Sequence, residues 1–280
     1  MKIVFMGTPD FSVPALEELE KVHQVAAVVT QQDRPKGRGH KMQYTPVKEK
    51  ALELNIPVYQ PEKVKNPEFV DILREINPDV IVVIAFGQIL SKEILDLPKY
   101  GCINVHASLL PKYRGAAPIQ WAVIDGEEET GVTTMYMAEG LDTGDVIDTA
   151  VIKLDEKETG GSLFDKLAIE GGKLIVETLS KLENGTATRT PQDDEKSSYA
   201  GKITKELGQI DFTKPAVTIE RLIRGLNPWP SAYTTLDGKA MKVWDATVEE
   251  GNVTEHSGIT VFGAPDNETV AFYRRFFNAV

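Results

Sequence analysis

Hydrophobic positions in the first half of the chain follow two alternating patterns. Short runs rich in Val and Ile, at residues 2–6, 25–30 and 79–85, predict β-strands, and the last is apolar enough for a strand buried on both faces. Between these runs, residues 13–22 and 67–76 place their apolar side chains at helical spacing. Strands that alternate with helices predict an α/β fold with a mostly parallel, Rossmann-like sheet covered on both faces.

The same alternation continues to about residue 185. Further strands are expected at residues 102–106, 131–137 and 145–154, and helices at 118–124 and 161–182. Asn184 and Gly185 then end the last helix.

The composition changes after this helix. Residues 186–198 are polar and lack apolar periodicity, which predicts a linker. A helix at 217–225 and two short strands at 233–236 and 242–246, joined by a turn at Asp237 and Gly238, indicate a small β-rich second domain. The expected regions are a first domain at 1–187, a linker at 188–205 and a second domain at 206–280.

Charge and cysteine content narrow the possible functions. The 280 residues carry a net charge of −11, which argues against a basic surface over the whole molecule. The single cysteine, Cys102, excludes an intramolecular disulfide and a multi-cysteine zinc site. The apolar start is too short for a signal sequence and no run approaches a membrane span, so we expect a cytoplasmic protein without membrane contact. Nothing in the sequence demands more than a monomer.

Phosphate-binding motifs are missing from the sequence. Gly7 ends the first strand, but neither G-x-G-x-x-G nor G-x-x-x-x-G-K-[ST] occurs, which disfavours a nucleotide cofactor. We interpret Gly7 as a tight-turn residue.

Two polar residues lie on the strand expected at 102–106. Asn104 and His106 are two positions apart, so they project from the same side, at the carboxyl end where open α/β sheets bind ligands. An amide donor beside an imidazole can polarise one carbonyl oxygen. A capping Asn and a structurally hydrogen-bonded His are the alternative, and for an isolated pair this is the commoner arrangement.

A glycine-rich segment at residues 139–145 supplies two carboxylates. Asp142 or Asp145 could orient His106, and the glycines would let the backbone approach a ligand closely. By itself such a segment is more often a surface turn. A metal site made by these three residues is disfavoured, because no cluster of His or Cys supports it.

A local excess of positive charge lies at residues 31–50. This segment holds six Lys and Arg residues against two Asp and Glu, a net charge of +4 in an acidic protein. A basic, glycine-rich loop suits contact with a phosphate backbone, although a solvated loop is the alternative.

Three long motifs carry a resemblance to a known family. They are FMGTPDF at residues 5–11, NVHASLLPKYRGAAPIQ at 104–120 and GLDTGD at 140–145, and NPWPSAY at 227–233 adds to them. From residue 1 to about 245 the chain resembles the methionyl-tRNA formyltransferases, within the larger family of folate-dependent formyltransferases and hydrolases.

The resemblance implies a formyltransferase catalytic domain followed by a smaller β-barrel (OB-like) domain that contacts tRNA. It implies transfer of the formyl group of 10-formyltetrahydrofolate to the α-amino group of methionine on initiator tRNA, without a metal. In the family's catalytic trio, Asn104 and protonated His106 would stabilise the oxyanion of the tetrahedral intermediate. Asp142 would hold His106 and assist proton transfer.

The resemblance also implies two sets of binding residues. The folate-contacting residues would be Ser108, Leu109, Leu110, Pro111, Phe86, Gly87, Gln88 and Leu90. The tRNA-contacting residues would be Arg34, Lys36, Arg38 and Lys41, with Arg38 at the position of the family's important arginine.

Some positions depart from the family's pattern. Gln32, Leu207 and Ser231 replace the commoner Pro, Asp and Gly, of which Gln32 would loosen the base of the basic loop. From about His256 the sequence no longer resembles the family, so we expect an incomplete barrel with exposed strand edges.

Two other functions stay open at this stage. The same trio could formylate another amine, such as an amino sugar on a nucleotide, against which the basic loop and the NPWP motif argue. A catalytically silent RNA-binding protein is the other alternative, against which the intact trio argues.

Overall fold

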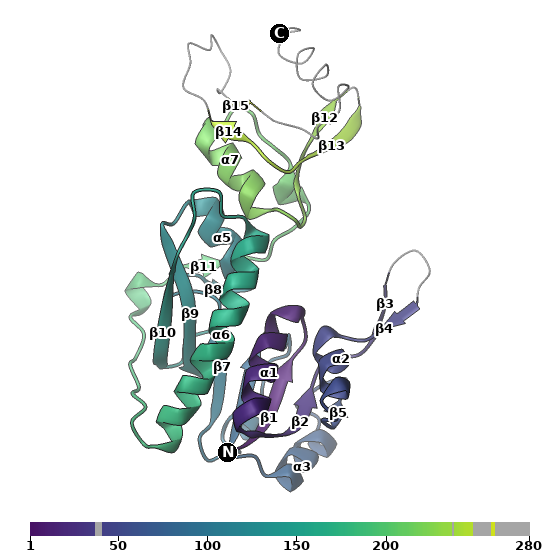
Figure 1. The fold of residues 1–280 in the computed structure, drawn as a ribbon, viewed down its shortest axis with the longest axis vertical. Coiled ribbons are helices and arrows are strands. Elements are labelled where there is room, and N and C mark those ends of the chain that lie inside the picture. The colour runs from purple at the N-terminus through teal and green to yellow at the C-terminus, as the bar shows by residue number, and fades with distance from the viewer. Residues whose placement is uncertain (37–40, 237, 249–258, 261–280) are drawn as a thin grey trace. The chain divides into compact units, whose positions relative to one another are not determined.

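The computed structural model describes residues 1–36, 41–236, 238–248 and 259–260, which form two compact units (Figure 1). The first unit contains Met1–Gly115, Thr130–Ile152 and Asp165–Tyr199. The second contains Ala116–Glu129, Lys153–Phe164 and the chain from Ala200 onward. Two segments that precede residue 165 therefore belong to the second unit.

A seven-stranded sheet in the order β10-β9-β7-β6-β1-β2-β5 forms the centre of the first unit. The pairs β1–β2, β1–β6, β2–β5 and β6–β7 are parallel, and β7–β9 is antiparallel. The mostly parallel sheet is therefore confirmed. Its strands are β1 (Lys2–Gly7), β2 (Gln24–Val29), β5 (Val58–Tyr59), β6 (Val80–Ile84), β7 (Cys102–His106), β9 (Glu129–Tyr136) and β10 (Val146–Lys153).

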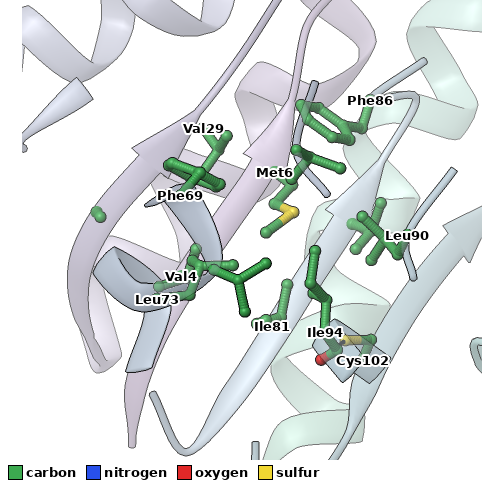
Figure 2. Close-up of a cluster of buried hydrophobic side chains, with 14 residues drawn as sticks. Val4, Met6, Val29, Phe69, Leu73, Ile81, Phe86, Leu90, Ile94 and Cys102 are labelled. Atoms are coloured by element: carbon green, nitrogen blue, oxygen red, sulfur yellow. Dashed lines mark hydrogen bonds between the residues drawn. The ribbon is translucent and has the colours of Figure 1, made fainter. Parts of the chain in front are cut away.

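One face of this sheet is covered by α3 (Pro67–Ile76) and α4 (Lys92–Leu95). Figure 2 shows Phe69 and Leu73 of α3 and Ile94 of α4 in one buried cluster with alternate residues of the strands. Because strand side chains point to opposite faces in turn, Val4 and Met6 of β1 reach this cluster while their neighbours point the other way.

The opposite face is covered by α1 (Val13–Val22) and α6 (Gly160–Glu183), which lie side by side in Figure 1. A Cβ added at Gly172 of α6 would lie 3.2 Å from the backbone of Pro14 and Ala15, and one at Gly171 would lie 3.1 Å from Val105 of β7. These glycines let α6 approach both α1 and the sheet. Helices on both faces explain why β6 is buried along its whole length.

The remaining elements of the first unit are short. They are α2 (Pro46–Glu53), β8 (Arg114–Gly115), the antiparallel pair β3 (Arg34–Lys36) and β4 (Lys41–Gln43), and 3₁₀ helices at Asp10–Ser12 and Asp194–Lys196. β11 (Tyr199–Ala200) crosses from the first unit to the second. The sequence did not predict these elements, because each is too short for a period of apolar residues or is polar throughout.

The second unit packs α5 (Pro118–Asp125) against α7 (Ala216–Gly225), with a 3₁₀ helix at Glu206–Gly208. Its strands are β12 (Ala232–Leu236), β13 (Lys239–Val243), β14 (Thr247–Val248) and β15 (Ile259–Thr260), paired antiparallel as β12–β13 and β14–β15. The strand expected at 242–246 begins earlier and ends at Val243. Ser231 has a φ of 73°, which explains why glycine suits this position.

Several predictions fall on residues beyond the described ranges. Asp237 of the expected turn, Arg38 of the basic segment and most of the sequence after residue 248 lie outside them. In the described residues, no helix is both long enough and apolar enough to cross a membrane.

Candidate active site

The carboxyl end of β7 carries the two polar residues expected there. Asn104 lies opposite Met135 of β9 and His106 opposite Thr133, so both are fixed by the register of the sheet. They point to the same side of the strand because they are two residues apart. Asp142 comes from the loop between β9 and β10, and its carboxylate reaches His106. The first unit thus brings all three predicted catalytic residues to one place.

The His106 imidazole is buried, and its two nitrogens face different groups. Nε2 lies 2.8 Å from the carbonyl oxygen of Tyr113. A carbonyl only accepts, so Nε2 carries the hydrogen and donates it. Nδ1 lies 3.7 Å from Asp142 Oδ2, which is longer than a hydrogen bond. Protonation of Nδ1 would therefore place a positive charge directly before this carboxylate.

The Asp142 carboxylate is itself held by the backbone. Its Oδ2 accepts a hydrogen bond from the Gly115 amide at 2.8 Å, and its side chain is 13% exposed. Asp142 adopts a φ of 52°, a left-handed conformation that is uncommon for a residue with a side chain. Tyr113 and Gly115 lie in the long motif at 104–120, but a backbone contribution from them could not be predicted from the sequence.

Asn104 completes the arrangement as an available donor. Its side chain is half-buried, and within the described part of the chain it makes no hydrogen bond. An amide on a rigid strand without an internal partner can bind a ligand oxygen at little cost in reorganisation.

The second carboxylate of the loop has a different role. Asp145 Oδ2 pairs with Arg189 Nε at 3.1 Å, and the Arg189 guanidinium lies over the Tyr136 ring. Burial raises the pKa of Tyr136, which outweighs the opposite effect of Arg189. Asp145 is therefore a partner of Arg189. Among the described residues, no group of three His, Cys, Asp or Glu side chains could hold a metal ion.

The segment at Ser108–Pro111 is fixed by internal hydrogen bonds. The Ser108 hydroxyl donates to the Lys112 carbonyl at 2.6 Å, and Thr133 Oγ1 donates to the Ser108 carbonyl and accepts from the Leu110 amide. Leu110 is buried, whereas Leu109 and Pro111 are half-buried. Ser108 is fully buried, so its hydroxyl stabilises the loop.

The segment after β6 contributes to the core as well as to the surface. Phe86 and Leu90 belong to the buried cluster of Figure 2. Gln88 Oε1 accepts from the Val64 amide at 2.7 Å, and Gly87 has a φ of 83°. Ile89, between Gln88 and Leu90, is 86% exposed.

The basic segment begins in β3 with an exposed Arg34. For Lys36 and Lys41 only the backbone is described, and Arg38 lies beyond the described residues. At its base, Lys48 Nζ contacts Asp33 Oδ2 at 2.5 Å and Gln60 Oε1 at 2.7 Å.

The pairing with Lys48 changes the pKa of the Asp33 carboxyl group. Burial acts to raise its pKa, but the hydrogen bonds from Lys48 and Gln60 outweigh burial and lower the pKa below the usual value. The residue that precedes β3 is thereby tied to α2 through Lys48 and to the end of the edge strand β5 through Gln60.

Comparisons with known proteins agree with this geometry. The formyl transferase family model matches residues 1–179, and the model of the formyl transferase C-terminal domain matches residues 202–271. The second match runs past residue 256, so similarity to the family continues beyond the point where the sequence analysis placed its end. The catalytic unit therefore has the fold of a formyl transferase.

Individual relatives narrow the family. Methionyl-tRNA formyltransferase of Agathobacter rectalis is 64% identical over 253 residues, 90% of this chain and 82% of the relative. That of Clostridioides difficile is 55% identical over 272 residues, 97% of this chain and 88% of the relative. The chain belongs to the methionyl-tRNA formyltransferase family.

A solved structure shares the fold at low identity. The N-formyltransferase from Helicobacter canadensis, in complex with folinic acid and dTDP-3-aminofucose, superposes with a TM-score of 0.68 at 21% identity. The match covers 91% of this chain and 90% of that protein.

Proposed function

We propose that the chain transfers the formyl group of 10-formyltetrahydrofolate to the α-amino group of the methionine carried by initiator tRNA, for translation initiation in the cytoplasm. The observation that carries the proposal is the trio itself. Asn104, whose side chain has no hydrogen-bond partner among the described residues, lies two positions along β7 from a His106 that faces the Asp142 carboxylate. The relatives at 55% and 64% identity are both methionyl-tRNA formyltransferases, which supports the choice of acceptor.

The chemistry follows from these positions. The amine attacks the formyl carbon and the carbonyl π electrons move to oxygen, which gives a tetrahedral oxyanion. Because His106 Nε2 already donates to the Tyr113 carbonyl, the Asn104 amide and Nδ1–H of the protonated His106 donate to this oxygen, and Asp142 stabilises the imidazolium by its charge. The ammonium proton then passes, through water held near Asp142, to N10 of the folate. Collapse of the intermediate breaks the bond from carbon to N10 and releases tetrahydrofolate.

The folate position is proposed from two segments, one that follows β6 and one that follows β7. Ser108, Leu109, Leu110 and Pro111 form a rigid wall, and Phe86, Gly87, Gln88 and Leu90 end the neighbouring strand β6. In open α/β sheets, ligands bind outside the carboxyl ends of the strands. The hydrogen bonds that fix both segments support a preformed site.

The tRNA contacts are proposed from charge. Arg34 is exposed, and Arg34, Lys36, Arg38 and Lys41 give this segment a positive charge on an acidic protein. The proposed domains remain 1–187, a linker at 188–205 and an OB-like domain at 206–280, which the two separate family matches support. We propose that the chain acts as a monomer.

Formylation of an amino sugar on a nucleotide is the second candidate, because an N-formyltransferase solved in complex with dTDP-3-aminofucose shares the fold. The test is formyl transfer from 10-formyltetrahydrofolate to methionyl initiator tRNA and, in parallel, to dTDP-linked amino sugars. We expect product only with the tRNA. Product only with the amino sugars would replace the proposed acceptor by the second candidate.

Two variants assign the parts of the site. His106→Ala should lower turnover far more than it weakens tRNA binding, because the imidazolium acts in the transition state. Arg38→Ala should weaken use of tRNA with little change in folate affinity. An unchanged turnover number in the first variant, or a loss of folate affinity in the second, would contradict these assignments.

A further inference from the structure

Gln192, in the polar segment that follows α6, connects two parts of the first unit through its side-chain amide. Its Nε2 donates to the carbonyl oxygens of Asp142 at 2.9 Å and Gly144 at 2.7 Å. Its Oε1 accepts from Arg114, at 3.0 Å from Nε and 2.8 Å from Nη2. The amide uses both donors and both lone pairs, so its hydrogen-bonding capacity is filled.

Arg114 lies between the two backbone groups that hold the catalytic side chains. The carbonyl of Tyr113 accepts from His106 Nε2, and the amide of Gly115 donates to Asp142 Oδ2. The same three-residue stretch is joined to the segment of Gln192 by its backbone, since Ser198 accepts from the Tyr113 amide through Oγ and from the Arg114 amide through its carbonyl.

The loop that carries Asp142 needs external support. Asp142 has a φ of 52°, a conformation that costs free energy for a residue with a side chain and that neighbouring contacts can compensate. Leu141 beside it is 60% exposed, so this side chain does not anchor the turn in the core. Gln192 binds the carbonyl of Asp142 itself and that of Gly144, which closes the loop from behind the carboxylate.

We infer that Gln192 is a positioning residue for the formyl transfer reaction. It fixes the loop of Asp142 relative to the Tyr113–Gly115 stretch, so that the carboxylate faces His106. The expected effect of Gln192 on turnover rests on the proposed function, whereas its expected effect on the order of the Asp142 loop does not. The segment expected to be a linker thereby contributes to the order of the active site.

Two substitutions distinguish the contacts of Gln192 with Arg114 from its contacts with the Asp142 loop. Gln192→Ala removes every contact. Gln192→Glu keeps oxygens that accept from Arg114 but replaces the donor by a second acceptor before two carbonyl oxygens. Both variants should therefore loosen the Asp142 loop. Glu195→Ala is the matched control, because Glu195 is exposed and lies three residues away in the same segment.

The first measurement is hydrogen exchange of the Gly115 amide, which donates to Asp142 Oδ2. Exchange should accelerate in Gln192→Ala and Gln192→Glu and stay unchanged in Glu195→Ala, with the circular dichroism of all three equal to that of the parent. Unchanged exchange at Gly115 in both Gln192 variants would overturn the inference, whether or not the protein forms formyl-methionyl-tRNA.

The second measurement is steady-state and single-turnover formyl transfer. In both Gln192 variants kcat should fall about 10- to 100-fold, the effect of a small misplacement of a catalytic group, with KM for tRNA and folate almost unchanged. In an Asp142→Asn background, Gln192→Ala should lower kcat little further, because both residues act through the same carboxylate. A rise in KM with unchanged kcat, or a full additional loss in the double variant, would overturn the inference. A parent without product would refute the proposed function alone.

Discussion

Replacing Asp142 by Asn tests the role of its charge while preserving the shape of the loop. Asn keeps a side-chain oxygen that can accept from the Gly115 amide, as Asp142 Oδ2 does at 2.8 Å. The substitution therefore removes the negative charge that lies 3.7 Å from His106 Nδ1 and leaves the backbone contact in place. We expect turnover to fall while both substrates still bind.

The distance between the two side chains sets the magnitude. At 3.7 Å, Coulomb's law gives about 1 kcal/mol with the screening of water and about 4 kcal/mol at an effective dielectric constant of about 20. The side chains are only 8% and 13% exposed, which favours the larger value. A loss within this range lowers the rate between roughly 6-fold and roughly 1,000-fold.

Single-turnover formation of formyl-methionyl-tRNA is the assay, with folate and tRNA affinities measured on the same preparations. Asp145→Asn is the matched control, since Asp145 lies on the same loop but pairs with Arg189. The control should retain the parent rate to within about twofold, as expected for a partly exposed ion pair. Equal rates for Asp142→Asn and Asp145→Asn would refute the electrostatic role of Asp142.

Three further predictions concern other parts of the chain. Affinity for methionyl-tRNA should fall with added salt, and Arg34→Ala should reduce the slope of log K against log salt by roughly 0.7–0.9; an unchanged slope would remove Arg34 from the phosphate contacts. Asp33 has a lowered pKa, so its stabilising effect is present above the usual value of 3.8 and is lost as the pH falls through the folded-state pKa. Lys48→Met should reduce this acid-dependent loss of unfolding free energy in denaturant titrations from pH 5 to 2, and an identical pH profile would contradict the pairing. Burial raises the pKa of Cys102 to about 12, so iodoacetamide at pH 8 should modify it only in unfolded chains, and rapid labelling of the folded protein would contradict its burial.

The sequence predicts the central sheet well because its strands and helices are long and periodic. Val13–Val22, Pro67–Ile76 and Cys102–His106 have the bounds that the apolar pattern indicates. The hairpin of β3 and β4 was missed because its three-residue strands have no apolar period. Residues 186–198 were interpreted as a linker because their contacts are polar, and hydrogen bonds such as those of Gln192 leave no hydrophobic pattern.

The candidate site could be predicted only as a set of side chains. Spacing on a strand indicated Asn104 and His106, the glycine-rich segment offered Asp142 or Asp145, and the family resemblance chose Asp142. The carbonyl of Tyr113 and the amide of Gly115 could not be predicted, because backbone groups exist at every residue and only the tertiary structure selects which ones bind. Phe86 and Leu90 were expected at the folate, and the structure places both in the hydrophobic core.

Formyl transfer from 10-formyltetrahydrofolate to methionyl initiator tRNA, measured beside folate binding to the same preparation, tests the central claim most directly. We expect folate binding and formyl-methionyl-tRNA as product, with turnover that depends on Asn104, His106 and Asp142. Folate binding without transfer to this tRNA would contradict the proposed acceptor.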